Sequence, residues 1–424
     1  MGLLKRGLSN SENSDTEEQE MQSDSSDSSD VSMTDSEDED QNDGIEVNNA
    51  TEAESSYLNN TDDNEEEEEE EDEVIKAIRR ENEKQRDHPP PIVCEDFITD
   101  ISFHPHEDIL AVGNIVGDVI FYKYTNDENT IMNTLEVHTK ACRDIEFNHD
   151  GKILFSIAKD KTIMLSDVET GKLIRFYDNS HEVPAYCIRI LDEYLFATGD
   201  DDGVVKLWDL RVKKDEKAVF SLKKNEDYIS DITSNEAQKY LLCSSGDGSL
   251  TTIDLQNRKF FMQSEEYEEE LTCLGLFRNE TKLLAGSSKG KLFLYNWNEF
   301  GLHSDAFPGP KSAINSLIPI TENIVVTACE DGNLRATHLF PHRHLGIAGQ
   351  HDLSVEKVDI CNTGKFIASC SHNNDIKFWN IEYFEEFEKV SHKHNKHNKK
   401  KEMEHNLPSS KRKNVAEFFS DLNS

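Results

Sequence analysis

Histidine, hydroxyl-bearing and aspartate residues recur together in this chain, and these three types form nucleophilic catalytic sites. One such group is His138, Ser156 and Asp160. A serine whose proton is taken by a histidine, itself oriented by an aspartate, carries out acyl transfer in hydrolases. Here, however, similar groups return at a regular interval, and a catalytic triad has no reason to repeat in this way. We therefore interpret the histidines as structural rather than catalytic.

The most complete group consists of His181, Thr198, Asp202 and Trp208. We expect its side chains to form one hydrogen-bonded chain, in which the Trp208 indole N–H donates to the Thr198 hydroxyl. His181 then joins that hydroxyl to the Asp202 carboxylate. Such a chain buries polar groups between strands without leaving any of them unpaired. A later group retains most of the same types, namely His351, Ser369 and Trp379.

Two short strands joined by a tight turn must position each group. Leu195–Arg211 contains both strands, with Asp202-Gly203 at the turn and Trp208-Asp209 at the end of the second strand. The position of Trp208 recurs at intervals of 42–45 residues, at Tyr122, Ser166, Trp208, Ile253, Tyr295, Thr337 and Trp379. Repeats of about 40–45 residues that end in Trp-Asp are typical of β-propeller blades. The spacing predicts an all-β, seven-bladed β-propeller, and a β-sandwich with coincidental spacing is the alternative.

The ring is expected to cover residues 92–388. Its last repeat ends near Trp379-Asn380 and lacks a fourth strand of its own. Ile92–Cys94 can supply that strand from the N-terminal side, and Tyr383–Glu388 is the competing segment. Closure matters because an open ring exposes two sheet edges. The fourth repeat, with Cys243 and Ile253, is expected to lack the hydrogen-bonded group altogether.

The N-terminal region has the composition of a disordered tail. Residues 9–73 contain 28 Asp or Glu and no Lys or Arg, in a chain whose net charge is −40. This segment also contains few apolar residues, and their burial cannot offset the entropy cost of ordering the chain. We expect residues 1–73 to be an acidic disordered tail, which either only solubilises the chain or binds basic proteins. Residues 74–91 are expected to form a short helix and a linker, which Pro89-Pro90-Pro91 ends.

The C-terminal region, residues 389–424, is expected to be a basic disordered tail. It contains nine Lys or Arg and four Asp or Glu. Two clusters, Lys399-Lys400-Lys401 and Lys411-Arg412-Lys413, are typical of nuclear import signals. The individual targeting residues are Lys399, Lys400, Lys401, Lys411, Arg412 and Lys413. Near the end, Phe418 and Phe419 share one helical face with Val415 and Leu422, which indicates a motif that docks into a partner's groove.

Several function classes lack residues to support them. No stretch approaches the roughly 18 apolar residues of a membrane span, and the eight cysteines include no C-x-x-C pair. We expect no cofactor, no metal and no catalysis. Unpaired cysteines indicate a reducing compartment, the cytosol or nucleus. Residues 74–388 carry a net charge of −19, the wrong sign for phosphate contacts, so direct RNA binding is not expected.

The ring resembles the WD-repeat propeller family, and within it the WD repeat-containing protein 55 family. The likeness is carried by the basic tail with its two phenylalanines and by Ala197–Arg211, Glu226–Ile232, Leu292–Gly301 and Gly364–Trp379. The resemblance implies a nuclear and nucleolar protein linked to ribosomal RNA production and ribosome assembly. Its partners would be pre-ribosomal or other nucleolar proteins, which it would hold as a non-enzymatic scaffold. We expect the propeller to be monomeric.

A second function remains open. Trp208-Asp209-Leu210-Arg211 resembles the W-D-x-R motif by which some WD-repeat proteins dock on the adaptor of a cullin-type ubiquitin ligase. The chain would then be a substrate receptor, and Arg211 would contact the adaptor. The motif occurs once, and an arginine after a blade end is often only a surface residue.

The repeat pattern also suggests where a partner binds. If each histidine reaches an aspartate in the turn, the residue before that turn should border the central channel on one face. These residues are Lys159, Asp201, Gly246, Ser288, Glu330 and His372. Their mixed charge favours a protein partner over RNA phosphates. We expect Asp201 and Glu330 to contact a basic segment of the partner, while Phe418 and Phe419 anchor a second one.

Overall fold

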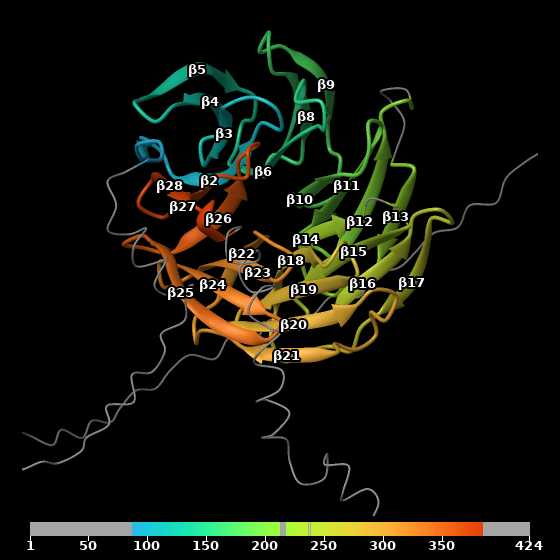
Figure 1. Cartoon of the computed structure of the whole chain (residues 1–424). Helices are drawn as coiled ribbons and strands as arrows, with labels where there is room; N and C mark the ends of the chain where they lie inside the picture. Colours follow the sequence, from blue (N-terminus) through green and yellow to red (C-terminus); the bar gives the residue numbers. More distant parts are fainter. Residues whose placement is uncertain (1–86, 213–217, 236, 238, 385–424) are drawn as a thin grey trace, which may run out of the picture. The chain divides into compact units, whose positions relative to one another are not determined.

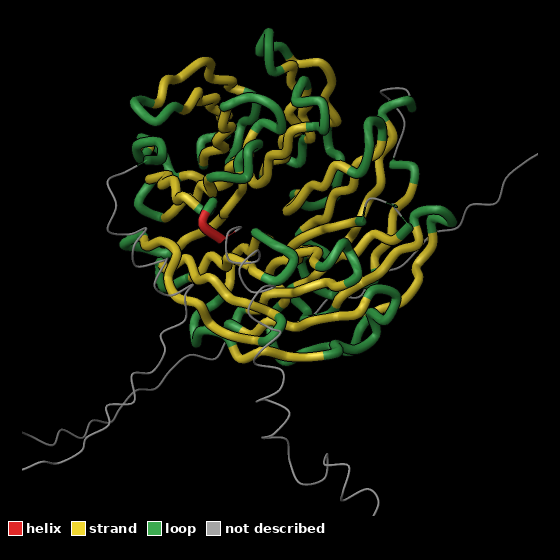
Figure 2. Tube along the Cα trace, in the orientation of Figure 1, coloured by secondary structure: helices red, strands yellow, loops and turns green. Residues whose placement is uncertain are grey.

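The computed structural model describes residues 87–384 except 213–217, 236 and 238. These residues form seven four-stranded antiparallel sheets, which follow one another around a ring (Figure 1). Strands and loops make up almost all of the described chain (Figure 2). The predicted all-β, seven-bladed β-propeller is confirmed. Both predicted tails lie outside the described residues, as do residues 74–86 of the predicted helix and linker.

Six of the seven blades consist of four consecutive strands. Blade 1 contains β2 (Ile98–Phe103), β3 (Ile109–Asn114), β4 (Asp118–Tyr124) and β5 (Asn129–Glu136). Blade 2 contains β6 (Cys142–Phe147), β7 (Ile153–Ala158), β8 (Ile163–Asp167) and β9 (Leu173–Tyr177). Blade 3 contains β10 (Ala185–Ile190), β11 (Leu195–Asp200), β12 (Val204–Asp209) and β13 (Phe220–Lys223). Blade 4 contains β14 (Ile229–Ser234), β15 (Tyr240–Ser245), β16 (Leu250–Asp254) and β17 (Lys259–Gln263). Blade 5 contains β18 (Leu271–Phe277), β19 (Lys282–Ser287), β20 (Lys291–Asn296) and β21 (Asp305–Pro308). Blade 6 contains β22 (Ile314–Pro319), β23 (Ile324–Cys329), β24 (Asn333–Leu339) and β25 (His342–Gln350).

The seventh blade combines the two ends of the described chain. Its strands are β26 (Val355–Ile360), β27 (Phe366–Ser371), β28 (Asp375–Asn380) and β1 (Ile92–Val93). Ile92 pairs with Ile376 and Val93 with Asp375. The N-terminal strand therefore closes the ring, as predicted. Tyr383 and Phe384, from the competing segment, lie outside any strand.

Proline explains why this closing strand has only two residues. Pro89-Pro90-Pro91 precedes it, and proline has no N–H to donate to a ladder. Side chains hold the proline segment instead. The Asn129 amide donates to the Pro90 carbonyl at 2.6 Å, and the Asn380 amide donates to the Asp87 carboxylate at 2.9 Å. The chain thus follows the edge of blade 7 without extending its ladder.

The second strand of each blade is the most buried, because it is packed against neighbouring blades on both faces. All six residues of β3, β15 and β23 are buried. The register agrees with the repeat spacing, since Trp208 lies opposite Phe196 and Trp379 opposite Ile367. The first strands surround the axis, and each contacts the first strands of the two adjacent blades, including β2 with β26.

Candidate functional site

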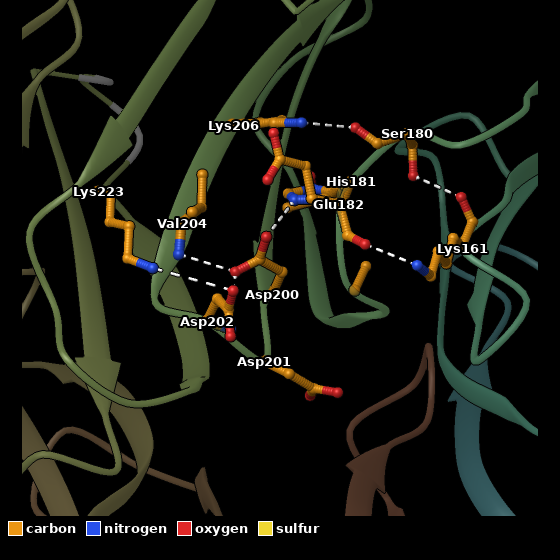
Figure 3. A network of polar contacts seen from close by, with 12 residues as sticks. Lys161, Ser180, His181, Glu182, Asp200, Asp201, Asp202, Val204, Lys206 and Lys223 are labelled. Carbon is orange, nitrogen blue, oxygen red and sulfur yellow. Dashed lines mark hydrogen bonds and ion pairs between the residues drawn. The ribbon is translucent and has the colours of Figure 1, made fainter. Parts of the chain in front are cut away.

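Blade 3 contains the hydrogen-bonded group that the sequence indicated, with one residue changed. The Trp208 indole N–H donates to the Thr198 hydroxyl at 2.8 Å, and His181 Nε2 lies 2.7 Å from the same oxygen. His181 Nδ1, however, lies 2.8 Å from Asp200 Oδ2 (Figure 3). The prediction that Asp202 supplies the carboxylate is therefore wrong, and Asp200 supplies it instead.

The direction of side chains along a strand explains this correction. Asp200 ends β11 two positions after Thr198, so both side chains leave the same face of the sheet. Its second oxygen accepts the N–H groups of Asp202 and Val204, at 3.0 and 2.8 Å, and so closes the turn. Asp202 lies in the turn itself and points toward Lys223, whose ammonium is 3.9 Å away (Figure 3).

Burial makes a catalytic role for this histidine untenable. The His181 side chain has no exposed surface, so no substrate can reach it. Burial also lowers the pKa of His181, although the Asp200 carboxylate opposes that shift. The group instead connects the loop before β10 to the second and third strands of its own blade.

Blades 2 and 7 use variants of the same device. In blade 7, His351 lies between the Ser369 hydroxyl, at 2.8 Å, and an Asp375 oxygen, at 3.0 Å, while Trp379 donates to Ser369. Blade 4 lacks this group, as expected, because Cys243 and Ile253 stand at the positions of Thr198 and Trp208. A different pair of contacts occurs there. There, Asn225 donates to Ser249 at 3.0 Å and accepts from Thr251 at 2.9 Å. An amide, which is both donor and acceptor, replaces the imidazole.

Carboxylates on the first strands form a second set of contacts, which the sequence analysis missed. Each accepts the backbone N–H of a residue on the first strand of the next blade, at 2.7–2.8 Å. The pairs are Asp100 with Ile145, Asp144 with Ile188, Glu146 with Ile190, Asp231 with Leu274, and Asp359 with Phe103. The sequence signal was an acidic residue at the third or fifth position of a first strand. These carboxylates fasten neighbouring blades around the channel.

The same carboxylates line a cavity of about 480 Å³ inside the channel, which we call the inner chamber. Burial raises the pKa of Glu146 to about 7 and that of Asp359 to about 6. Two basic side chains also line the inner chamber. Arg189 lies 3.2 Å from Glu146, and Lys357 lies 3.9 Å from Asp100. Burial opposes the charge of Lys357, but the surrounding carboxylates raise its pKa well above the ordinary value.

A larger cavity, of about 960 Å³, lies where the first strands begin, and we call it the wide mouth. In every blade the pairing of the first and second strands shifts after the first residue. Such a bulge changes the direction of the extra side chain. The seven extra residues all line the wide mouth, and they are Thr99, Arg143, Tyr186, Ser230, Thr272, Asn315 and Glu356.

The structure brings most of the expected partner-binding residues to this mouth. Four of them line it, namely Lys159, Ser288, Glu330 and His372. Asp201 instead forms an ion pair with Arg143, which does line the mouth. Gly246 lies against Tyr228, since a Cβ atom there would come within 2.4 Å of that ring. The blade 1 equivalent, Ile115, was not among the expected residues, and its side chain is exposed in the mouth.

The rim of the wide mouth is uneven from blade to blade. Tyr186 and Tyr228 pack together with ring centroids 4.9 Å apart, and the Tyr228 hydroxyl donates to Glu270 at 2.9 Å. The Arg143 guanidinium lies 5.4 Å from the centre of the Tyr186 ring. His372 lies 2.7 Å from Glu356. The rim therefore offers aromatic, apolar, acidic and basic sectors to a ligand.

Arg211, the candidate ligase contact, is bound within its own motif. Its guanidinium donates to both oxygens of Asp209, at 2.9 and 2.7 Å, and lies 5.1 Å from the centre of the Tyr194 ring. The remaining candidate residues lie outside the described residues. They are Lys399, Lys400, Lys401, Lys411, Arg412, Lys413, Phe418 and Phe419.

Within residues 87–384, apart from their short gaps, no group of three or more His, Cys, Asp or Glu could hold a metal ion. No helix in the same part of the chain is long and apolar enough to cross a membrane.

The fold is shared with solved structures. A chain in the crystal structure of a mitotic checkpoint complex superposes with a TM-score of 0.63. The match covers 70% of this chain and 93% of that one, at 13% sequence identity. At so low an identity the likeness concerns the fold alone.

Sequence comparison is more specific. A WD repeat-containing protein 55 homolog from Aedes aegypti is 58% identical over 346 residues, which cover 82% of this chain and 73% of the relative. The Drosophila melanogaster homolog is 51% identical over 340 residues, covering 80% and 68%. The family model described as WDR55 matches residues 89–384, the whole ring. The chain therefore belongs to the WD repeat-containing protein 55 family.

Proposed function

We propose that this chain is a non-catalytic scaffold of the nucleolus, which supports ribosomal RNA production and ribosomal subunit assembly by binding other proteins. Membership of a WD-repeat propeller family supports the general role, because such propellers typically act as non-catalytic scaffolds. The ribosomal link is drawn from the family resemblance of the sequence.

The wide mouth is the observation that carries the binding role. Glu330 is exposed on its rim and has no basic partner among residues 87–384 as described. Asp201 was expected to share the partner's basic segment, but its pairing with Arg143 leaves it less available. Glu270 is the better second contact, because its carboxylate accepts from the Tyr228 hydroxyl and has no basic partner in the described part of the chain. Basic segments are common in proteins that bind RNA, and carboxylates attract them while repelling phosphate.

Affinity purification from nuclear extract followed by mass spectrometry tests this function. The wild-type chain is expected to recover pre-ribosomal proteins, and Glu330→Lys should lower their yield about tenfold. Glu322→Lys is the matched control, because Glu322 is exposed in the same blade beyond the other end of β22. Equal yields from both variants would exclude the wide mouth as the binding site for these proteins. Recovery of a cullin-ligase adaptor that is lost with Arg211→Ala would favour the substrate-receptor function instead.

Nuclear import forms a separate part of the proposal. Lys399–Lys401 and Lys411–Lys413 would provide the signal, and retention in the nucleolus would follow from the bound partners. Alanine at all six positions should leave a fluorescently tagged chain largely cytosolic. Alanine at Lys389, Lys393 and Lys396, which are isolated lysines of the same region, should leave the distribution unchanged. Nuclear accumulation of the six-alanine variant would show that these clusters are not the signal.

A further inference from the structure

One side of the wide mouth combines an apolar patch with acidic residues. The patch consists of Phe97, Ile115 and Leu353, from blades 1 and 7. Ile115 and Leu353 are 51% and 50% exposed. The Ile115 N–H donates to the Phe97 carbonyl at 2.9 Å. The Phe97 ring also packs on His372 with centroids 4.9 Å apart, so the patch is continuous across the junction of the two blades.

The acidic residues occupy the adjoining blades. Glu270, Glu330 and Glu356 come from blades 5, 6 and 7. Of the basic lining residues, Lys159 and Arg143 come from blade 2, and Lys357 comes from blade 7, where it lies 3.9 Å from Asp100 of the inner chamber. Glu356 is paired with His372, and Arg143 is paired with Asp201. Within the described residues, this leaves Glu270 and Glu330 as the acidic side chains of the mouth without a basic partner. A ligand that fits this side of the mouth carries a large apolar side chain close to basic ones.

The chain itself contains a segment of this chemistry. Lys411-Arg412-Lys413 is followed by Val415, and then by Phe418 and Phe419. The basic cluster matches the acidic residues of blades 5 and 6, and the phenylalanines match the apolar patch. The groove between β5 and the β8–β9 turn, of about 410 Å³, is also apolar but offers Glu136 as its only acidic residue in the described part of the chain. It therefore matches the segment less well.

The length of the connecting chain permits this contact. Residues 385–410, a stretch of 26, separate the last described residue from the basic cluster. Fully extended, such a stretch spans up to about 85–95 Å. A compact domain of about 300 residues has a radius of gyration near 19 Å. The connection can thus reach the wide mouth from any point on the ring.

We propose that residues 411–419 of this chain occupy its own wide mouth when no partner is bound, with Phe418 or Phe419 on the patch of Phe97, Ile115 and Leu353. The basic cluster then lies against Glu270 and Glu330. This inference rests on the proposed function in that it regulates the same mouth. A partner's basic segment must displace the tail, so the tail sets a threshold for binding.

Photo-crosslinking in the purified full-length chain tests the contact. A benzophenone amino acid replaces Phe419, the sample is irradiated at low protein concentration, and the crosslinked peptides are identified by mass spectrometry. The main product should be intramolecular and should join position 419 to residues 97–116 or 353–372. Combining the label with Glu270→Gln and Glu330→Gln should lower that product at least fivefold. Glu107→Gln, which removes an exposed carboxylate at the other end of blade 1, should leave it unchanged.

Three results would overturn the inference. Crosslinks between two chains would mean that the tail binds in trans, and crosslinks to the groove beside β5 would place it elsewhere. A yield insensitive to Glu270→Gln and Glu330→Gln would remove the charge contact. The test involves no extract, so its failure leaves the pull-down result on pre-ribosomal proteins standing. Conversely, an intramolecular crosslink together with a failed pull-down would keep the contact and reject the proposed partners.

Discussion

The ring wall and the wide mouth are built from the same types of side chain, yet their polar groups differ in what they contact. In the wall, defined here by the networks within the blades and the carboxylates on the first strands, protein groups satisfy the polar atoms. Thr198 accepts from Trp208 and contacts His181, and Asp100 accepts the Ile145 N–H. At the mouth, Glu330 is exposed without a basic partner among the described residues.

This difference separates residues that build the ring from residues that can bind a ligand. A buried polar group that has lost its partner costs about 1–3 kcal/mol, so changes in the wall should lower stability. Surface substitutions away from such contacts usually fall within about 0.5 kcal/mol. Changes at the mouth should therefore leave stability intact and alter binding alone. Four measurements test this contrast.

The largest effect is expected in the network of blade 3. Trp208→Ala should lower the free energy of unfolding by about 3–5 kcal/mol, because it opens a cavity and removes a donor from Thr198. Ile253→Ala, at the equivalent position of blade 4, should cost about 2–4 kcal/mol, since no polar group loses a partner there. Denaturant titration of both variants provides the measurement. Equal losses would show that the network adds nothing beyond packing.

A smaller loss is expected for the carboxylates between blades. Asp100→Ala should cost about 1–3 kcal/mol, because the buried N–H of Ile145 then has no acceptor. Asp100→Asn keeps an oxygen at that place and should cost less. The two variants share the loss of charge, so thermal denaturation of both isolates the hydrogen bond. If they melt together well below the wild type, the charge matters and the bond does not.

Stability should also depend on pH through the inner chamber. Glu146 has a pKa of about 7 in the folded ring against an ordinary 4.5, and Asp359 about 6 against 3.8. Between these values the folded state binds more protons than the unfolded state, so stability falls as pH rises from about 4 to 7. Glu146→Gln should reduce that fall. A melting temperature that rises over this range in the wild type would contradict the shifts.

The smallest effect is expected at the mouth. Glu330→Lys should change the melting temperature no more than Glu322→Lys does, because neither carboxylate has a basic partner in the described part of the chain. Differential scanning calorimetry of the two proteins measures this directly. A clear loss of stability in Glu330→Lys alone would mean that Glu330 stabilises the ring as the wall residues do. The contrast between the two regions would then fail.

Repeat spacing made the architecture predictable, including the closing strand at Ile92–Val93. It sets the phase of each blade but does not say which of several polar neighbours points inward. Three aspartates, Asp200, Asp201 and Asp202, stand in a row, and spacing alone favoured the last one. The alternation of side chains along a strand would have selected Asp200, because it shares a face with Thr198.

The wide mouth was harder to predict for a different reason. Its lining depends on a bulge that repeats in every first strand, and a bulge leaves no fixed residue type in the sequence. Tyr186 and Arg143 therefore occupy equivalent positions without resembling each other. The contacts of Asn225 in blade 4 were not predicted either. This residue stands at the histidine position of other blades and shares hydrogen-bonding capacity with histidine rather than shape.

The pairing of β1 with β28 has a consequence for the synthesis of this protein. Ile376 follows its partner Ile92 by 284 positions, so the first ordered strand leaves the ribosome long before its mate exists. At about 5–20 residues per second the wait is roughly 15–60 s. Throughout that time six blades can form while the seam stays open. Until β28 is synthesised, β1 therefore remains an unpaired strand, which is open to pairing with another chain.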